Sequence, residues 1–294
     1  MPTANTSAPL AAALKKRAMA LDAELIRRLR RADRLSFRLL HDARLGTKRL
    51  RAWWRLMPPV AGKAAVRQAD QRLAGAARLL APMRDAYVMR RMLSHLAAQA
   101  PEGTVRTACE AGARQMAVAG PEGAAPPAFP ALRDQLVRAL ASDTAAWRRL
   151  PVAPTADALL VAQMAEAYRR ARRQAGGRDL HAWRKWVKVH LAQLEFLQTE
   201  RARTLARHLR PLARLGRQLG RCQDLAVLDG WFEWRESAGA IGGKEARRLH
   251  AYLDRRRKSL RRRCERLGRQ LLADKTRVFA LRLHKAARIP LRIT

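Results

Sequence analysis

One stretch of the sequence, residues 39–56, places basic side chains in a row along a single side of a predicted helix. At 100° per residue, the row falls within about 80° of the helix circumference. Its members are His41, Arg44, Lys48, Arg51 and Arg55, and Arg38 extends it toward the N-terminus. Because like charges four residues apart destabilise a helix, we expect an anionic partner to neutralise this row, which is roughly 21 Å long.

The residue types in this row suit phosphate groups. Arginine presents a planar fork that matches paired phosphate oxygens, and lysine acts as a mobile point charge. A histidine donates one hydrogen bond when neutral and two when protonated. A polyanion bound at His41 favours the protonated ring, so binding should tighten as the pH falls. A solvated charged face without a ligand is the alternative, and the recurrence of the pattern in the second half of the chain argues against it.

The pattern H-x-x-R-x-x-x-K occurs twice, as "HDARLGTK" from residue 41 and as "HAWRKWVK" from residue 181. The basic residues of the second copy are His181, Arg184, Lys185 and Lys188. An aspartate follows each copy at nearly the same separation, Asp85 in the first half and Asp224 in the second. These aspartates are either helix N-caps or partners of the basic residues. Two motifs in the same order indicate an internal duplication, which commonly packs about a pseudo-two-fold axis.

The second copy offers a shorter basic face than the first. Leu191 and Glu195 stand at the positions that correspond to Arg51 and Arg55. The second copy also has Ala182 where the first has an aspartate, which argues against a metal-dependent phosphohydrolase built on a repeated His–Asp pair. Dense cations around such a site would oppose metal binding as well.

The charge balance limits the classes of partner and of activity. The 294 residues include 61 Lys and Arg against 24 Asp and Glu, a formal net charge of +37. Nucleic acid, an anionic membrane surface and a phosphate polymer are the partners that fit such a charge. The sequence contains no P-loop, G-x-S-x-G or H-E-x-x-H pattern, and its three cysteines form no C-x-x-C pair. We therefore expect a binding protein and not an enzyme, with no catalytic residue, metal ligand or cofactor.

Apolar residues recur at three- and four-residue spacing along most of the chain, which predicts an all-α fold. The expected organisation is a first helical half at 1–120, a linker rich in Pro and Gly at 121–130, and a second helical half at 131–294. Helices are predicted near 9–32, 34–57, 63–81, 85–99, 104–118, 131–149, 156–175, 178–200, 202–219, 224–237 and 244–272. No apolar run is long enough to span a membrane, and no secretory signal pattern is present, so we expect a cytoplasmic protein.

The two helices that carry the repeated motif resemble those of a known family. "LLHDARLGTKRLRAWWRL" is similar to the first signature helix of the CHAD family, the conserved-histidine α-helical domain, and "LHAWRKWVKVHLAQLEFL" is similar to the second. The resemblance covers residues 10–285. It implies two helical bundles related by a pseudo-two-fold axis, with a basic groove or pore between them. It also implies binding of inorganic polyphosphate, association with polyphosphate granules, and no general catalytic activity.

In the first copy the family's basic positions match His41, Arg44, Lys48 and Arg51. In the second copy they match all four basic residues, His181, Arg184, Lys185 and Lys188. One departure lies at His190–Leu191, where many relatives carry a further arginine. The resemblance therefore implies that the first half contributes more affinity. Two alternatives stay open: a non-specific nucleic-acid-binding or scaffold protein, and an enzyme that acts on phosphate polymers. Attachment of the C-terminal helix to a membrane surface is a weaker third alternative, because its apolar line is narrow.

Overall fold

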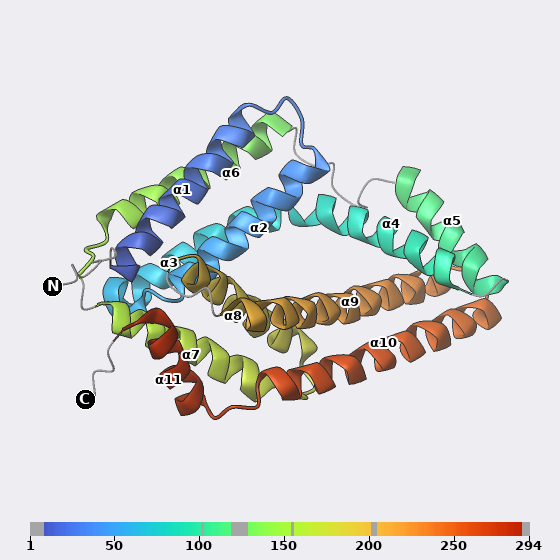
Figure 1. The fold of residues 1–294 in the computed structure, drawn as a ribbon. Coiled ribbons are helices and arrows are strands. Elements are labelled where there is room, and N and C mark those ends of the chain that lie inside the picture. The colour runs from blue at the N-terminus through green and yellow to red at the C-terminus, as the bar shows by residue number, and fades with distance from the viewer. Residues whose placement is uncertain (1–8, 101–102, 119–128, 154–155, 201–204, 290–294) are drawn as a thin grey trace.

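The computed structural model describes residues 9–100, 103–118, 129–153, 156–200 and 205–289 (Figure 1). Within these ranges it contains eleven α-helices and no strand, which confirms the predicted all-α class. In chain order they are α1 (Leu10–Arg30), α2 (Phe37–Trp54), α3 (Pro58–Leu79), α4 (Ala81–Gln99), α5 (Thr104–Val118), α6 (Phe129–Arg149), α7 (Ala156–Gln174), α8 (Leu180–Glu200), α9 (Ala206–Ser237), α10 (Gly243–Leu271) and α11 (Thr276–Ala287). Most of the predicted linker at 121–130 lies outside the described residues.

Polar side chains fix the starts of the two helices that carry the repeated motif. At the start of α2, Oγ of Ser36 accepts a hydrogen bond from the backbone N–H of Leu39 at 3.2 Å. At the start of α8, Oδ1 of Asp179 accepts from the backbone N–H of Ala182 at 2.9 Å. Such N-caps each stabilise a helix by about 1 kcal/mol. Both motif histidines therefore lie within the first two turns of a capped helix.

The structure differs from the predicted helices at two places in the second half. α9 runs without a break where we predicted separate helices near 202–219 and 224–237. Gly220 lies inside this continuous helix, where α8 packs closely: a Cβ on Gly220 would lie 3.2 Å from Nη2 of Arg184. The second difference is α11, which no predicted helix covers. Its row of buried apolar residues, which includes Phe279 and Leu283, packs against α7.

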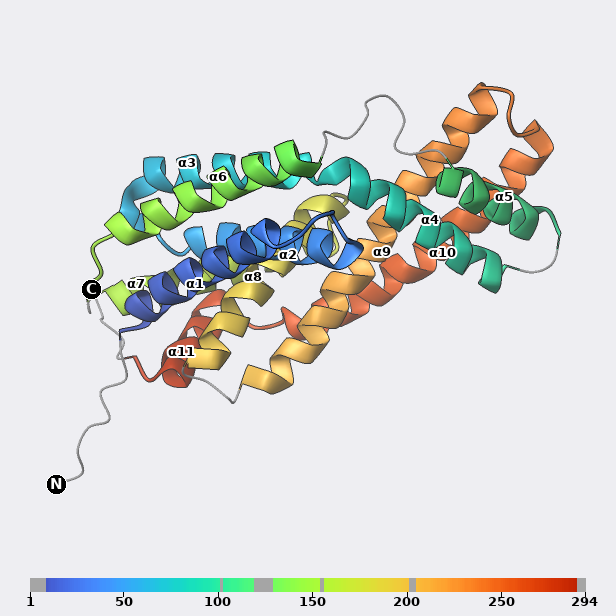
Figure 2. The same cartoon turned by 90° about the horizontal axis from the view of Figure 1, so that it is seen from above.

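The described helices form two large hydrophobic cores and one small apolar cluster between α2, α7 and α8. The larger core joins α1, α2, α3, α6, α7, α8 and α11 with the first part of α9 and the last part of α10. The smaller core joins α4 and α5 with the second part of α9 and the first part of α10. Figures 1 and 2 show the smaller group at one end of the molecule, where α9 and α10 lie side by side. Each core contains helices from both predicted halves, and α6 packs on α1 and α3. The division of the chain into two halves stays a prediction.

The contacts between α2 and α8 are reciprocal. Nε1 of Trp53 donates to the carbonyl oxygen of Ala192 at 3.3 Å, and Nε2 of Gln193 donates to the carbonyl oxygen of Ala52 at 3.0 Å. When His41 is aligned on His181, residues 52 and 53 correspond to residues 192 and 193. The two hydrogen bonds are therefore exchanged, as they are across a two-fold axis. An internal repeat would give such an exchange, and the repeat itself stays a prediction. The basic groove between the two halves stays a prediction.

α8 also carries a histidine in the interior. His190 is 0% exposed, and its ring lies against Tyr168 and Phe279, with centroid separations of 5.5 and 5.3 Å. Neither ring nitrogen has a hydrogen-bond partner among the described residues. Burial and the neighbouring His208 lower the pKa of His190 to about 3. The ring is therefore neutral at any pH well above that value.

We expect acid to destabilise the protein through His190. In the unfolded chain an imidazole binds its proton near pH 6.5, whereas the folded protein disfavours the proton until the pH reaches about 3. The neutral, buried imidazole therefore contributes its full stabilisation above pH 6.5. This contribution to the free energy of unfolding is lost as the pH falls, by about 2 kcal/mol at pH 5. Urea unfolding at pH 7.5 and pH 5 should show this loss for the native chain and a smaller loss for His190→Phe. His181→Gln, which removes an exposed histidine, is the control, and an undiminished loss in the His190 variant contradicts the prediction.

None of the described helices combines the length and the apolar character that a membrane span requires. The three cysteines, Cys109, Cys222 and Cys264, are free and buried.

Candidate anion-binding site

The second copy of the motif lies on the side of α8 that packs against α9. Gln223 of α9 contacts two of its members: Oε1 accepts from Nη1 of Arg184 at 2.7 Å, and Nε2 lies 2.9 Å from Nδ1 of His181. With Nδ1 as the acceptor of this amide hydrogen bond, Nε2 of His181 carries the proton and can donate to an anion. The glutamine therefore fixes the direction in which both basic side chains point.

Two glycines on α9 leave room for the longer side chains of this face. A Cβ on Gly220 would lie 3.2 Å from Nη2 of Arg184, and a Cβ on Gly216 would lie 3.2 Å from Cε of Lys188. Burial and the charge of Arg184 lower the pKa of Lys188, and Glu195 opposes this shift. The residue as a whole nevertheless stays exposed. Larger residues at these two glycine positions would displace both cations from α9.

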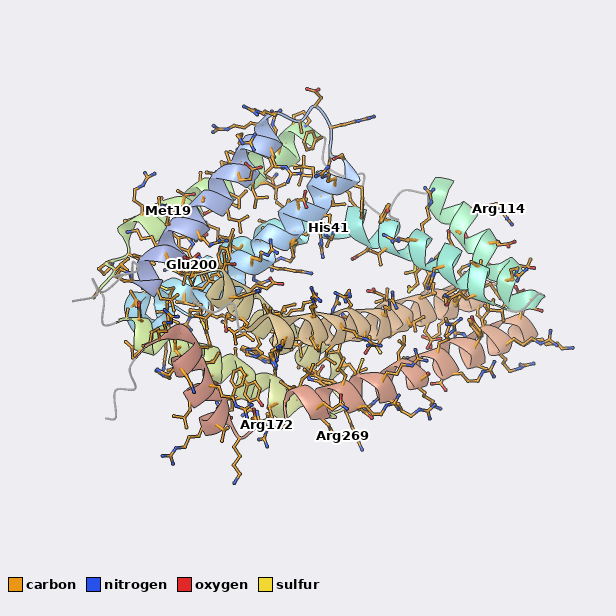
Figure 3. All side chains as sticks on the ribbon, viewed as in Figure 1. Met19, His41, Arg114, Arg172, Glu200 and Arg269 are labelled. Carbon is orange, nitrogen blue, oxygen red and sulfur yellow. The ribbon has the colours of Figure 1, made fainter. Side chains whose placement is uncertain are left out.

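The first copy of the motif lies on α2. Arg38, His41 and Lys48 are exposed, whereas Arg44 is half-buried, with its Nη1 3.4 Å from the carbonyl oxygen of Ala77 on α3. Figure 3 labels His41 on this helix. The two copies therefore share one pattern, in which the histidine and the lysine are exposed and the arginine between them is half-buried.

Two exposed aromatic rings lie next to the first copy. The ring of Phe37, at the start of α2, stacks on the ring of Tyr87 from α4, with centroids 3.6 Å apart. Phe37 is 40% exposed and Tyr87 is 37% exposed. The Phe37 centroid lies 6.2 Å from that of His41. The sequence did not indicate this pair, because the two residues are far apart in the chain and neither belongs to the motif.

The end of the first basic row forms a separate cluster around Asp70 of α3. Arg51 donates to both carboxylate oxygens, from Nε at 3.0 Å and from Nη2 at 3.1 Å, and Arg55 donates from Nη2 at 2.8 Å. Burial opposes ionisation of Asp70, but the hydrogen bond from Arg51 and the charge of Arg55 lower its pKa. Burial and the charge of Arg55 lower the pKa of Lys185, which reaches this cluster from α8. Asp70 thus supplies part of the neutralisation that the sequence left to an outside anion.

The ten predicted residues therefore fall into three groups and not into the two predicted basic faces. The first group is Arg38, His41, Arg44 and Lys48 on α2, the second is His181, Arg184 and Lys188 on α8, and the third is Arg51, Arg55 and Lys185 around Asp70. α2 and α8 contact each other through their C-terminal halves, where Nη2 of Arg49 also lies 3.7 Å from Oε2 of Glu195. A single site that contains both motif copies stays a prediction.

Comparison with known proteins identifies the fold and the family. A sequence model described as the CHAD domain matches residues 12–233, which is most of the chain. The chain belongs to the CHAD domain family. Among solved structures, a similar one is the crystal structure of the CHAD domain from the plant Ricinus communis, with a TM-score of 0.60 and 17% sequence identity. The similarity covers 92% of this chain and 94% of that chain, and at this identity it shows the shared fold alone. A comparison with curated proteins gave no match.

The two repeated aspartates of this CHAD domain lie inside helices. Asp85 belongs to α4, whose N-cap is Leu80, and Asp224 belongs to α9, whose N-cap is Leu205. The N-cap interpretation of these aspartates is therefore wrong. It failed because α9 continues through the position where the sequence suggested a new helix, and because α4 begins before Asp85. The other interpretation, that each aspartate holds a neighbouring cation, stays a prediction.

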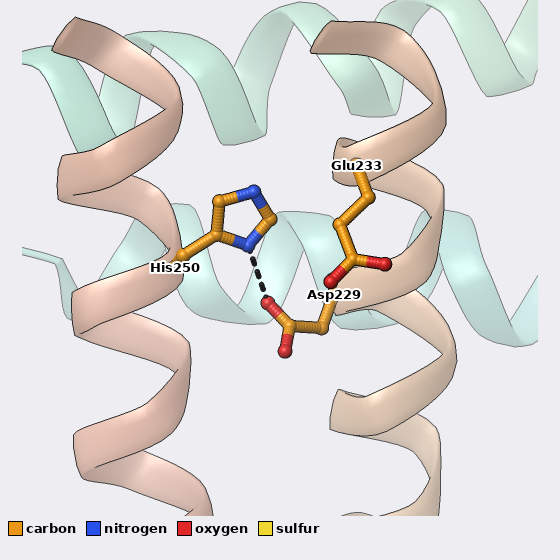
Figure 4. A group of neighbouring side chains, drawn as sticks. All are labelled: Asp229, Glu233 and His250. Carbon is orange, nitrogen blue, oxygen red and sulfur yellow. Dashed lines mark hydrogen bonds and ion pairs between the residues drawn. The ribbon is translucent and has the colours of Figure 1, made fainter. Parts of the chain in front are cut away.

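One trio among the described residues of the CHAD domain could hold a metal ion. Asp229 and Glu233 of α9 and His250 of α10 offer ligand atoms that all lie within 4.8 Å of one another (Figure 4). Nδ1 of His250 lies 2.6 Å from Oδ1 of Asp229, and Nη1 of Arg257 lies 3.5 Å from Oδ2 of Asp229. Asp229 thus already has two partners, and an adjacent arginine opposes a bound cation. Nothing else in the trio points to a metal, and the expectation of no metal ligand stays a prediction.

Proposed function

We propose that this CHAD domain binds inorganic polyphosphate through the basic residues of α2 and α8. The observation that carries the proposal is the shared exposure pattern of the two motif copies. In each copy an exposed histidine and an exposed lysine flank a half-buried arginine. Such an arrangement presents three donors along about two helical turns, which suits a linear chain of phosphate groups. The family resemblance implies the same ligand.

The binding mechanism is charge neutralisation. Each phosphate contact releases a condensed counter-ion, so the affinity should fall steeply with salt concentration. A polymer also engages several weak contacts at once, which raises the overall affinity without any single strong contact. Arg51 and Arg55 should contribute less per residue than the motif residues, because Asp70 already satisfies their guanidinium groups.

A competition titration at about 150 mM salt tests the proposal. Labelled long-chain polyphosphate is displaced by duplex DNA, by single-stranded RNA and by short-chain polyphosphate, compared per phosphate. We expect long-chain polyphosphate to bind at least about tenfold more tightly than either nucleic acid, a difference of roughly 1.4 kcal/mol. Equal displacement per phosphate by DNA or RNA means that the basic faces are only a field of positive charge, and the proposal then fails.

Single-stranded nucleic acid is the second candidate, and one observation favours it. Exposed aromatic rings beside cations are a common platform for stacked bases, and the Phe37–Tyr87 stack next to His41 has this form. The RNA arm of the titration decides between the two. If RNA wins, Phe37→Ala should weaken RNA binding more than polyphosphate binding, because polyphosphate has no base to stack.

Two finer parts of the proposal need experiments of their own. The first is that the domain binds polyphosphate without hydrolysing it. Incubation of polyphosphate with the protein and Mg²⁺ or Mn²⁺, followed by phosphate counting, should release no phosphate above the blank. The second is association with polyphosphate granules in the cytoplasm. A fluorescent fusion should colocalise with granules and become diffuse in cells that make no polyphosphate.

A further inference from the structure

The solvent face of α11 carries two large aliphatic residues. The opposite face of this helix, which includes Phe279 and Leu283, is buried, and α11 packs against α7. On the solvent face Val278 is 40% exposed and Leu281 is 43% exposed. Residues three apart in a helix are neighbours on its surface, so these two side chains form one apolar patch. A surface helix normally turns its polar side to water, and this helix exposes apolar side chains there as well.

Cations lie on both sides of this apolar patch. At 100° per residue, every exposed residue of α11 falls within an arc of about 140°. In order around the helix these residues are Arg277, Leu281, Lys285, Val278 and Arg282. The two arginines therefore flank the aliphatic pair, and the lysine lies between them, one turn beyond Leu281.

The positive charge of this face is mostly not neutralised by the protein. α11 contains no aspartate or glutamate. Asp274, which lies just before the helix, pairs with Arg282. Arg277 and Lys285 have no ion pair with the described part of the chain. Lys275, the residue before the helix, is also exposed and adds a further positive charge.

α11 lies at an edge of the molecule that a flat surface can reach. It is the red helix at the lower left of Figures 1 and 3. Figure 3 labels Arg172 of α7 and Arg269 of α10 along the same lower edge, and both residues are exposed. Three helices therefore contribute cations to this edge. The motif residues proposed for polyphosphate lie on α2 and α8, so the α11 face is a separate surface.

The combination of apolar and basic side chains limits the kind of partner. A phosphate polymer offers only charge and would leave the two aliphatic side chains in water. An anionic phospholipid surface accommodates both kinds of side chain. Aliphatic groups enter the boundary between headgroups and acyl chains, while lysine and arginine reach the lipid phosphates.

The structure also shows which helix is available to a membrane surface. From the sequence, the weaker alternative of membrane attachment concerned the helix near 244–272, which is α10. The apolar line of α10 is occupied, because Leu249 is 0% exposed and Leu253 is 2% exposed in the smaller core. α11, which the sequence did not predict, is the helix whose apolar pair faces outward.

We propose that α11 attaches this protein to an anionic phospholipid surface. Val278 and Leu281 lie at the boundary between headgroups and acyl chains, and Arg277, Arg282 and Lys285 contact lipid phosphates. The helix lies on the surface and does not cross it. Because the apolar patch is small, the attachment is weak and reversible. The proposal goes beyond polyphosphate binding and does not depend on it.

Vesicle sedimentation tests the proposal with two variants that keep the net charge. The full chain is mixed at about 150 mM salt with vesicles of phosphatidylcholine, with or without one-third phosphatidylglycerol. The first variant combines Val278→Ser with Leu281→Ser. The matched control combines Leu159→Ser with Val227→Ser, which removes two aliphatic residues of α7 and α9 that are 45% and 52% exposed.

We expect the native chain to bind the vesicles that contain phosphatidylglycerol and not those of phosphatidylcholine alone. The α11 variant should need at least about fivefold more lipid for half-maximal binding, and the control should bind as the native chain does. Equal loss in the two variants, or no loss in either, overturns the proposal, because the vesicles then recognise only the net charge. Polyphosphate affinity should be unchanged in both variants, so that a failure here is distinct from a failure of polyphosphate binding.

Discussion

Replacement of Arg38, Arg44 and Lys48 of α2 together by glutamine should weaken the binding of long-chain polyphosphate by about 50-fold at 150 mM salt. The magnitude follows from counter-ion release. For a single-stranded polyanion each lost contact lowers the salt slope by about 0.7, which at 150 mM amounts to about fourfold in affinity per contact. The plot of log affinity against log salt should accordingly become shallower by about 2 in this variant. A fluorescence titration at several salt concentrations measures both quantities.

The matched control removes the same number of charges elsewhere. Arg255, Arg262 and Arg269 are exposed on α10, and Figure 3 labels Arg269 on that helix. Their replacement by glutamine leaves the net charge of the control equal to that of the α2 variant. We expect the control to lose only the weak, long-range part of the attraction. If both variants lose the same affinity and the same salt slope, the polymer recognises the net charge of the protein and not the motif on α2.

Helix periodicity was sufficient to predict most of the fold. The apolar spacing predicted α2, α7, α8 and α10 to within a few residues, because each of them has one face buried in a core. It did not predict that α9 is continuous, since glycine commonly ends helices and the apolar spacing does not show that the helix passes through Gly220. The packing of α6 against α1 could not be predicted from the sequence either. The spacing of apolar residues within each helix does not show which helices pack together.

The candidate site was predictable only in part. The repeated motif was visible because each copy lies within one helix, where spacing fixes which side chains share a face. Asp70, Gln223 and Gly216 were not identified, although they hold or accommodate basic residues of the motif helices. They lie on other helices, and of the three only Gln223, which precedes the repeated Asp224, stands in a stretch that the sequence pattern marks. Such partners depend on how helices pack, and local spacing contains no information about that packing.

Packing also explains how α2 is held in place. Trp54, at the end of α2, donates from Nε1 to Oδ1 of Asp143 on α6 at 3.0 Å. Nε1 of Trp147 donates to Oδ2 of Asp143 at 3.0 Å, and Nη2 of Arg72 lies 3.3 Å from Oδ1. Asp143 is 0% exposed, so this carboxylate joins α2, α3 and α6 inside the larger core. This buried acid therefore helps to hold α2, and with it the basic face, in place.

A second buried acid lies beside the first. Asp22 of α1 is 0% exposed, and its Oδ2 accepts from the hydroxyl of Thr144 at 3.2 Å. Burial and the charge of Asp143 raise the pKa of Asp22 to about 8. Burial also raises the pKa of Asp143, but Arg72 and the two indole N–H groups favour its ionised form. At neutral pH the pair therefore holds one proton on Asp22 and one negative charge on Asp143.

We expect Asp22→Asn to stabilise the protein, by about 4 kcal/mol at pH 7. The unfolded carboxyl group ionises near pH 3.8 and the folded one near 8, so the stabilisation by the protonated group is complete below pH 3.8 and is lost as the pH rises through 8. An asparagine is neutral throughout, accepts from Thr144 and can donate to Asp143. Urea unfolding should therefore show almost no gain at pH 4 and the full gain at pH 7. Asp143→Asn is the control and should destabilise at pH 7, because Arg72 loses its buried counter-charge. A gain in stability that is the same at both pH values, or a loss at pH 7 in the Asp22 variant, contradicts the presence of a proton on Asp22 at neutral pH.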